Sequence, residues 1–162
     1  MTIDKVKILS DLDAAWSDLQ VLVDSVPQDR FEQSGVVEEW SVKALLGHMG
    51  FWAEKAAQDP KALGSGGEDE IETPGGDEMV AQWNAREATA RHEMSLGELR
   101  DEWEKSFTNA RTAFEAVPAE KLEIEVKGWP QLSRFLGDTT IHYREHEHHI
   151  RTWLKQLETT EG

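Results

Sequence analysis

The most informative stretch of the chain runs from residue 141 to residue 150 and reads Ile-His-Tyr-Arg-Glu-His-Glu-His-His-Ile. An α-helix turns about 100° per residue, so side chains four positions apart lie on one face. His142, His146 and His149 then point in one direction, and His148 points away. A His-x-x-x-His pair on one helix face is the spacing with which a helix binds a metal ion through two imidazole nitrogens. This stretch predicts a helix that carries half of a metal site.

Helical periodicity continues through the rest of the chain. Apolar residues recur at spacings of three and four, whereas the only hint of a strand is the short segment 124–126. The helices are expected at about 4–26, 42–57, 77–92, 95–116 and 130–157, the last one bent near Gly137. Five helical segments with almost no strand predict an all-α bundle, and the length of 162 residues predicts a single domain over residues 1–162.

Local signals set the expected helix ends. Ser41 is a suitable N-cap for the second helix, and Asp59-Pro60 is expected to end it. Residues 60–76 contain five glycines and two prolines, which predicts a long crossover loop between the second and third helices. Such a loop is either a plain surface connection or the rim of an active site. In the third helix, the candidate buried positions are Val80, Trp83, Ala88 and Ala90.

Composition narrows the classes of function. The formal net charge is −15, and a surface of this sign repels nucleic-acid phosphates and anionic lipid headgroups, so we expect neither nucleic acid nor membrane as a partner. The chain has no cysteine, which excludes disulfides, thiolate ligands and a cysteine nucleophile. Any thiol chemistry requires a thiol from another molecule. No signal peptide or apolar span is apparent, and a cytoplasmic location is the expectation.

A metal site needs further ligands, and His48 is the best third candidate. It is the only histidine in an otherwise apolar segment, on the expected inner face of the second helix. A buried neutral imidazole needs either a hydrogen-bond partner or a metal. Three imidazoles with one open position would activate a bound water or another nucleophile. His149 is a candidate catalytic residue, as a further ligand, a base behind the ligands or a proton shuttle.

Plainer interpretations stay open for these residues. Histidines on an acidic helix are often solvated side chains, and a lone histidine on an apolar face is often a hydrogen-bonded core residue. Most of the seven tryptophans are expected in the core. Trp52 is the exception: it follows His48 by four residues, and we predict that it lines the cofactor or substrate pocket.

Several segments resemble the DinB-like superfamily of metal-binding four-helix bundles, its ClbS/DfsB-type branch most of all. They are residues 38–48, 82–86, 128–130, 142–146 and 150–154, and they include the pattern Trp-Ser-x-Lys-x-Leu-x-x-His that ends at His48. The resemblance implies a four-helix bundle and a three-histidine metal site, matched here by His48, His142 and His146. It also implies zinc, nickel, manganese or iron as the divalent metal, and often a homodimer.

The resemblance implies two kinds of function. Some relatives are enzymes that use the metal to activate a low-molecular-weight thiol or water, for transfer to, or hydrolysis of, a small electrophile in detoxification, resistance or stress response. Others are non-catalytic resistance proteins that sequester a small molecule, with a structural or absent metal. We expect a small-molecule substrate in either case, and the first kind is our leading hypothesis.

Overall fold

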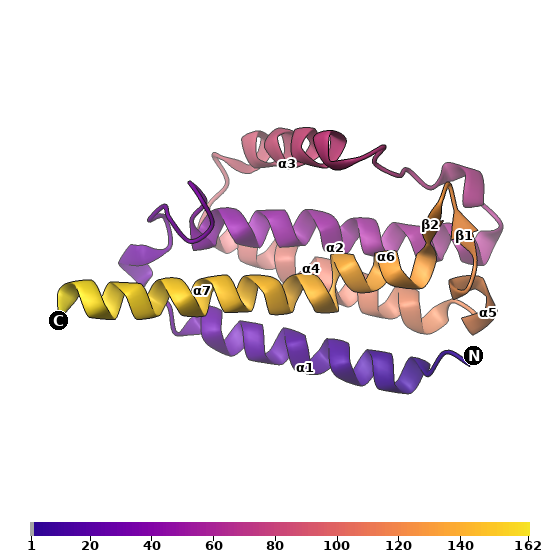
Figure 1. The fold of residues 1–162 in the computed structure, drawn as a ribbon, viewed down its shortest axis with the longest axis horizontal. Helices are drawn as coiled ribbons and strands as arrows, with labels where there is room; N and C mark the ends of the chain where they lie inside the picture. Colours follow the sequence, from indigo (N-terminus) through magenta and orange to yellow (C-terminus); the bar gives the residue numbers. More distant parts are fainter. Residues whose placement is uncertain (1) are drawn as a thin grey trace.

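The computed structural model describes residues 2–162, whose regular structure is almost entirely helical (Figure 1), so the predicted all-α class is confirmed. The long helices are α1 (Lys5–Asp24), α2 (Val42–Ser65), α3 (Asp77–Arg91), α4 (Leu96–Ala116) and α7 (Thr140–Glu161). The short elements are η1 (Gln28–Arg30), η2 (Glu68–Glu70), α5 (Ala119–Leu122), β1 (Glu125–Val126), β2 (Trp129–Pro130) and α6 (Gln131–Asp138). None of the helices within residues 2–162 is long and apolar enough to cross a bilayer.

The bundle consists of four long helical segments: α1, α2, α4 and the nearly continuous pair α6–α7 (Figure 1). The most extensive packing joins α2 to α4, while α7 packs against α1 and, with α6, against α2. Small residues allow the close approach of α2 and α4. A Cβ added at Gly50 would lie 3.6 Å from the Cα of Trp103, so the two backbones nearly touch there. The buried alanines Ala53, Ala57 and Ala110 extend this contact region.

Helix α3 lies outside the bundle, alongside α2 (Figure 1). It has no fully buried residue. The prediction that Ala88 and Ala90 are buried was wrong, because both are exposed, whereas Val80 and Trp83 are half-buried. Residues two positions apart on a helix point about 200° apart, so positions 88 and 90 cannot both face the protein.

Helix α2 is longer than predicted. The expectation that Asp59-Pro60 ends it was wrong, because the helix passes through Pro60 and ends at Ser65, with Gly66 in a left-handed conformation at φ +76°. A proline inside a helix removes one backbone hydrogen bond. Here Pro60 and Leu63 are both buried, and burial of apolar surface favours continuing the helix. The crossover loop is correspondingly shorter than predicted.

The predicted final helix is two helices. Instead of a bend near Gly137, the chain breaks at Thr139, which has φ −127° and ψ −96°. The Thr139 hydroxyl donates a hydrogen bond to the Phe135 carbonyl at 2.7 Å, and this buried contact closes α6. The break sets the direction in which α7 leaves, and therefore where its histidines point.

Candidate metal centre

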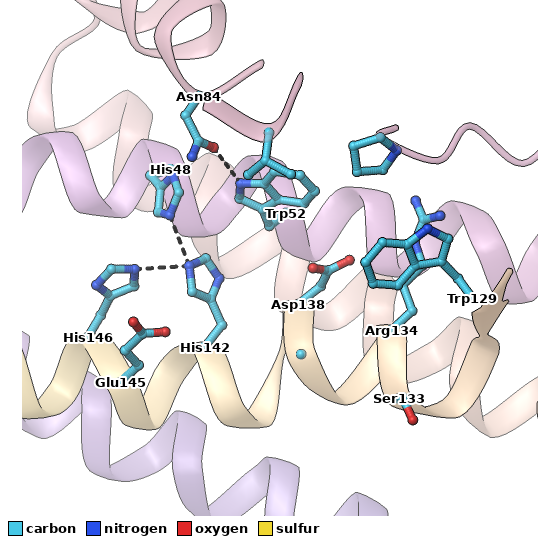
Figure 2. Close-up of a pocket in the computed structure, with 13 residues that line it drawn as sticks. His48, Trp52, Asn84, Trp129, Ser133, Arg134, Asp138, His142, Glu145 and His146 are labelled. Carbon is cyan, nitrogen blue, oxygen red and sulfur yellow. Dashed lines mark hydrogen bonds between the residues drawn. The ribbon is translucent and has the colours of Figure 1, made fainter. Parts of the chain in front are cut away.

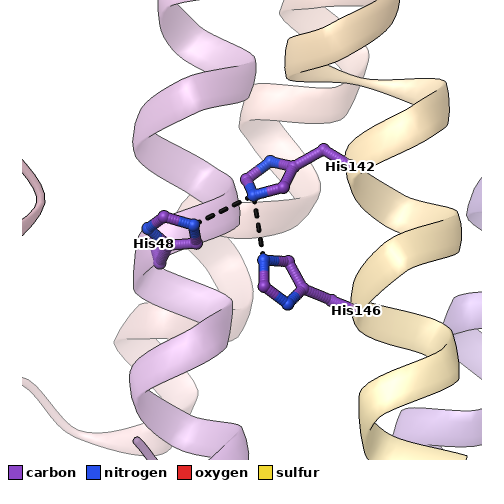
Figure 3. Close-up of side chains that lie close together, drawn as sticks. All are labelled: His48, His142 and His146. Atoms are coloured by element: carbon purple, nitrogen blue, oxygen red, sulfur yellow. Dashed lines mark hydrogen bonds between the residues drawn. The ribbon is translucent and has the colours of Figure 1, made fainter. Parts of the chain in front are cut away.

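Three histidines from two helices meet inside the bundle (Figure 2). His48 comes from α2, and His142 and His146 come from successive turns of α7. The Nε2 atom of His142 lies 2.9 Å from Nε2 of His48 and 2.9 Å from Nε2 of His146 (Figure 3). One nitrogen from each ring can be chosen so that all three lie within 4.8 Å of one another. The structure therefore brings together the three residues that the sequence proposed as ligands.

Hydrogen bonds among the three imidazoles do not satisfy all of their nitrogen atoms. A neutral imidazole has one N–H and one lone pair, yet Nε2 of His142 faces two nitrogens at once. If both neighbours donate to it, they compete for one lone pair. Nδ1 of His142 then carries the proton, and it is buried without a well-formed hydrogen bond. A cation that accepts all three lone pairs removes this conflict, so the residues fit a metal ion.

The spacing of the nitrogens also suits a transition metal. Nitrogens bound tetrahedrally at about 2.0–2.1 Å lie about 3.3 Å from one another. The two distances of 2.9 Å are shorter than this and the farthest pair of nitrogens lies within 4.8 Å, so side-chain rotations are needed to bring all three to coordination distance. Three imidazoles leave a fourth coordination position for a substrate atom, as in catalytic rather than structural sites.

The three rings are neutral at physiological pH. Burial, together with the charge of a neighbouring histidine, lowers the pKa of each of His48, His142 and His146 to about 3. The backbone carbonyl of Asp138 acts to raise the pKa of His142, but it does not form a full hydrogen bond with Nδ1. Only the neutral form of imidazole binds a metal, so this environment keeps the lone pairs available.

A cavity of about 490 Å³ opens beside the three rings (Figure 2). Its wall combines apolar and aromatic side chains with a few polar groups: His48, Trp52, Pro74, Val80, Asn84, Trp129, Ser133, Arg134, Gly137, Asp138, His142, Glu145 and His146. Trp52, proposed from the sequence as a cofactor-binding residue, lies in this wall. Its indole Nε1 donates a hydrogen bond to Asn84 Oδ1 at 2.8 Å, and this bond joins α2 to α3.

A second cavity of about 300 Å³ lies on the other side of His48, between α2 and α3. His48 and Asn84 line both cavities. Trp40 lines only the second, and the edge of its ring packs against His48 with centroids 4.7 Å apart. The larger cavity therefore borders all three histidines, and the second cavity borders only His48.

The remaining histidines lie away from the cavity beside the cluster. His149 does not line that cavity; its Nδ1 atom lies 3.3 Å from Nδ1 of His146, behind the ring. A hydrogen bond there leaves Nε2 of His146 directed toward the other two histidines. His148 and His92 are exposed.

Reasoning from sequence missed Asp138, Arg134 and Trp129 as cavity residues. The spacing of four residues between Asp138 and His142 would place both on one face of a continuous helix, but the break at Thr139 separates them, so that spacing alone does not locate Asp138. Burial raises the pKa of Asp138 to about 7, while the positive charge of Arg134 works in the opposite direction. Trp129 follows Gly128, which has a positive φ of +83° in the turn between β1 and β2.

Comparison with known proteins gives one informative match. The family model of the mycothiol maleylpyruvate isomerase N-terminal domain matches residues 12–153. No curated protein and no solved structure matches the chain significantly. The family match covers most of the sequence, including all three clustered histidines, and confirms the resemblance to the DinB-like superfamily. The chain therefore belongs to the mycothiol maleylpyruvate isomerase N-terminal domain family, whose domain is of the DinB-like type.

Proposed function

We propose that this protein is a metal-dependent enzyme that activates a low-molecular-weight thiol, of the mycothiol type, for reaction with a small electrophile. The observation that carries the proposal is the cluster of three neutral imidazoles, two buried and one half-buried, all of which line the larger cavity. The family model that matches the chain is named for a mycothiol-dependent reaction, which supports the choice of a thiol over water.

His48, His142 and His146 are the residues that would hold the metal. A divalent transition metal bound there supplies a Lewis acid, which lowers the pKa of a thiol or water that it binds. Because the chain has no cysteine, the thiol must come from a cosubstrate. In this proposal the two cavities, which share His48 in their walls, provide separate sites for the thiol and the electrophile.

Other side chains orient the reacting groups. His149 fixes the tautomer of His146 through the Nδ1 contact of 3.3 Å and serves as a base behind the ligands. Trp52, held by Asn84, forms an apolar wall that excludes water from the larger cavity. The proposed catalytic role of His149 is thus to position and to exchange a proton with His146, at Nδ1.

The test compares His142→Ala with His148→Ala, which removes an exposed histidine from the same helix. Metal content is measured by elemental analysis, and thiol consumption with the reporter electrophile 1-chloro-2,4-dinitrobenzene. We expect one metal per chain in the wild type and in His148→Ala, none in His142→Ala, and at least a hundredfold loss of rate in His142→Ala. Full metal occupancy or an unchanged rate in His142→Ala would contradict the proposal.

The same assay separates catalysis from sequestration. An enzyme turns over many equivalents of electrophile per chain, whereas a sequestering protein stops at about one. Sequestration that persists in His146→Ala would show that the protein captures the electrophile without the metal centre and would overturn the enzymatic proposal.

A further inference from the structure

The wall of the larger cavity contains a carboxyl group with one buried oxygen that forms no hydrogen bond within residues 2–162. Asp138 lies at the end of α6, and its side chain lines the cavity beside His142. Its Oδ2 atom is buried and has no hydrogen-bond partner. A buried polar atom without a partner is unfavourable, so an unpartnered oxygen in a cavity wall is a candidate for a hydrogen bond to a ligand.

Arg134 does not serve as that partner. It is the only arginine or lysine in the cavity wall, and each of its three nitrogens has a contact elsewhere. Nε lies 2.9 Å from Asp59 Oδ2, one terminal nitrogen donates to Thr73 Oγ1 at 2.9 Å, and the other donates to the Glu72 carbonyl at 2.6 Å. Asp59 and Arg134 are both buried and lie within ion-pair distance, so the charge of Arg134 is already opposed by a carboxylate other than Asp138.

The rest of the cavity wall favours a cationic or apolar ligand over an anionic one. In Figure 2 the Asp138 carboxylate projects from α6 toward α2, and the indoles of Trp52 and Trp129 lie on either side of it in this view. Indole faces attract cations as well as apolar groups. Glu145 adds a second carboxylate to the wall, and the net charge of −15 further disfavours anions.

We infer that the larger cavity binds a small, largely apolar or aromatic substrate bearing a protonated amine, which donates a hydrogen bond to Asp138 and lies against Trp52 and Trp129. The inference rests on the proposed function in one respect, namely that the cavity beside the histidines is the substrate site. It adds a substrate class. The electrophile carries a basic nitrogen and no free carboxylate.

Three probes of nearly equal shape test the charge preference: 1-naphthylmethylamine, 1-naphthylmethanol and 1-naphthoic acid. Affinities are measured by calorimetry on the full chain, stripped of metal, because an amine or a carboxylate would otherwise coordinate it. The variants are Asp138→Asn and, as a control with the same change in charge, Asp101→Asn, whose side chain is exposed on α4. Circular dichroism establishes that both variants are folded.

The wild type should bind the amine at least about tenfold more tightly than the alcohol, and the carboxylate most weakly, as a charge-assisted hydrogen bond requires. Asp138→Asn should remove the advantage of the amine and leave the alcohol unchanged, and Asp101→Asn should behave as the wild type. Equal affinities for amine and alcohol, no amine binding at millimolar concentration, or a preference that survives in Asp138→Asn would overturn the inference.

The two proposals fail separately. If the protein binds no metal and consumes no thiol but still prefers the amine through Asp138, the proposed function is refuted and the inference about the cavity stands. If the metal centre is active and the protein shows no such preference, the inference about the cavity is refuted and the proposed function stands.

Discussion

At the scale of single residues, the site consists of groups whose burial is unfavourable without a ligand. Two imidazoles face a single nitrogen of the third, which can serve only one of them with its lone pair, and the carboxyl of Asp138 has a buried oxygen without a partner. Each of these groups has a shifted pKa, because burial penalises its charged form. The shifts make the stability of the protein depend on pH in opposite directions.

The buried histidines should make the metal-free protein sensitive to acid. The pKa of His142 is about 3 in the folded chain and 6.5 in the unfolded chain, so below pH 6.5 the unfolded chain takes up a proton that the folded chain excludes. Stability is therefore complete above pH 6.5 and declines as the pH falls toward 3. Each such histidine contributes up to about 1.4 kcal/mol per pH unit to the slope.

Urea unfolding of chelator-treated protein across this pH range measures the slope. His142→Gln should reduce it, since the glutamine does not titrate. His148→Gln, at an exposed position, should leave it unchanged. Equal slopes in all three proteins would show that His142 is readily protonated in the folded state.

Asp138 should destabilise the protein at neutral and higher pH. Its pKa rises from 3.8 to about 7 on folding, so the folded chain retains a proton that the unfolded chain has already lost. Stability therefore declines as the pH rises from 3.8 through 7. Asp138→Asn removes this cost and should raise the free energy of unfolding at pH 8 by on the order of 2 kcal/mol.

This gain in Asp138→Asn should shrink as the pH approaches 3.8, and the control Asp101→Asn should show no comparable gain. A loss of stability in Asp138→Asn at pH 8 would mean that the carboxylate is satisfied in the folded protein. Groups that bind a ligand often lower the stability of the free protein in this way.

At the scale of elements, α2 supports both the fold and the site. One face packs against α4 through Gly50 and its alanine neighbours, and another presents His48 and Trp52 to the cavity. The two roles are coupled, because the distance of α2 from α4 fixes how far His48 reaches toward α7. Helix α3, which has no fully buried residue, only closes the outer side of the cavities.

Substitutions at Gly50 test the close approach of α2 and α4. A Cβ at this position lies 3.6 Å from Trp103 Cα, an ordinary contact, so Gly50→Ala should stabilise the protein by about 0.5–1 kcal/mol through helix propensity. Gly50→Leu has no room and should destabilise it by about 1–3 kcal/mol. Thermal unfolding measures both, and a stable Gly50→Leu would show that the helices separate easily.

At the scale of the whole molecule, the proposed metal links two helices that are far apart in the sequence. His48 and His142 are separated by 94 positions in sequence, and a shared ion would cross-link α2 to α7 in the folded state alone. A ligand that binds only the folded state stabilises it according to its concentration. The net charge of −15 adds general repulsion, which a bound cation reduces.

Zinc should therefore raise the melting temperature of metal-free protein. At a free concentration a hundred times its Kd, the stabilisation is about 2.7 kcal/mol, or roughly 5–10 °C for a chain of this size. Differential scanning calorimetry measures the shift. His142→Ala should show almost none of it, and His148→Ala should show all of it; an equal shift in both variants would place the zinc elsewhere.

The sequence by itself determines the local helical structure of this protein. Helical periodicity, the capping box of Ser95 and Glu98, and the shared face of His142 and His146 are properties of a backbone that repeats every 3.6 residues. Predictions were wrong where a local signal met burial from distant parts of the chain, as at Pro60, which the apolar surroundings of α2 retain inside the helix.

The meeting of His48 with the α7 histidines, the ion pair of Arg134 and Asp59, and the position of Asp138 in the cavity were decided by tertiary structure alone. Sequence could nominate His48 because it stands alone among apolar residues, but not show what lies opposite it. Side-chain convergence depends on how helices far apart in sequence pack, and that packing is set by the whole core rather than by any local spacing.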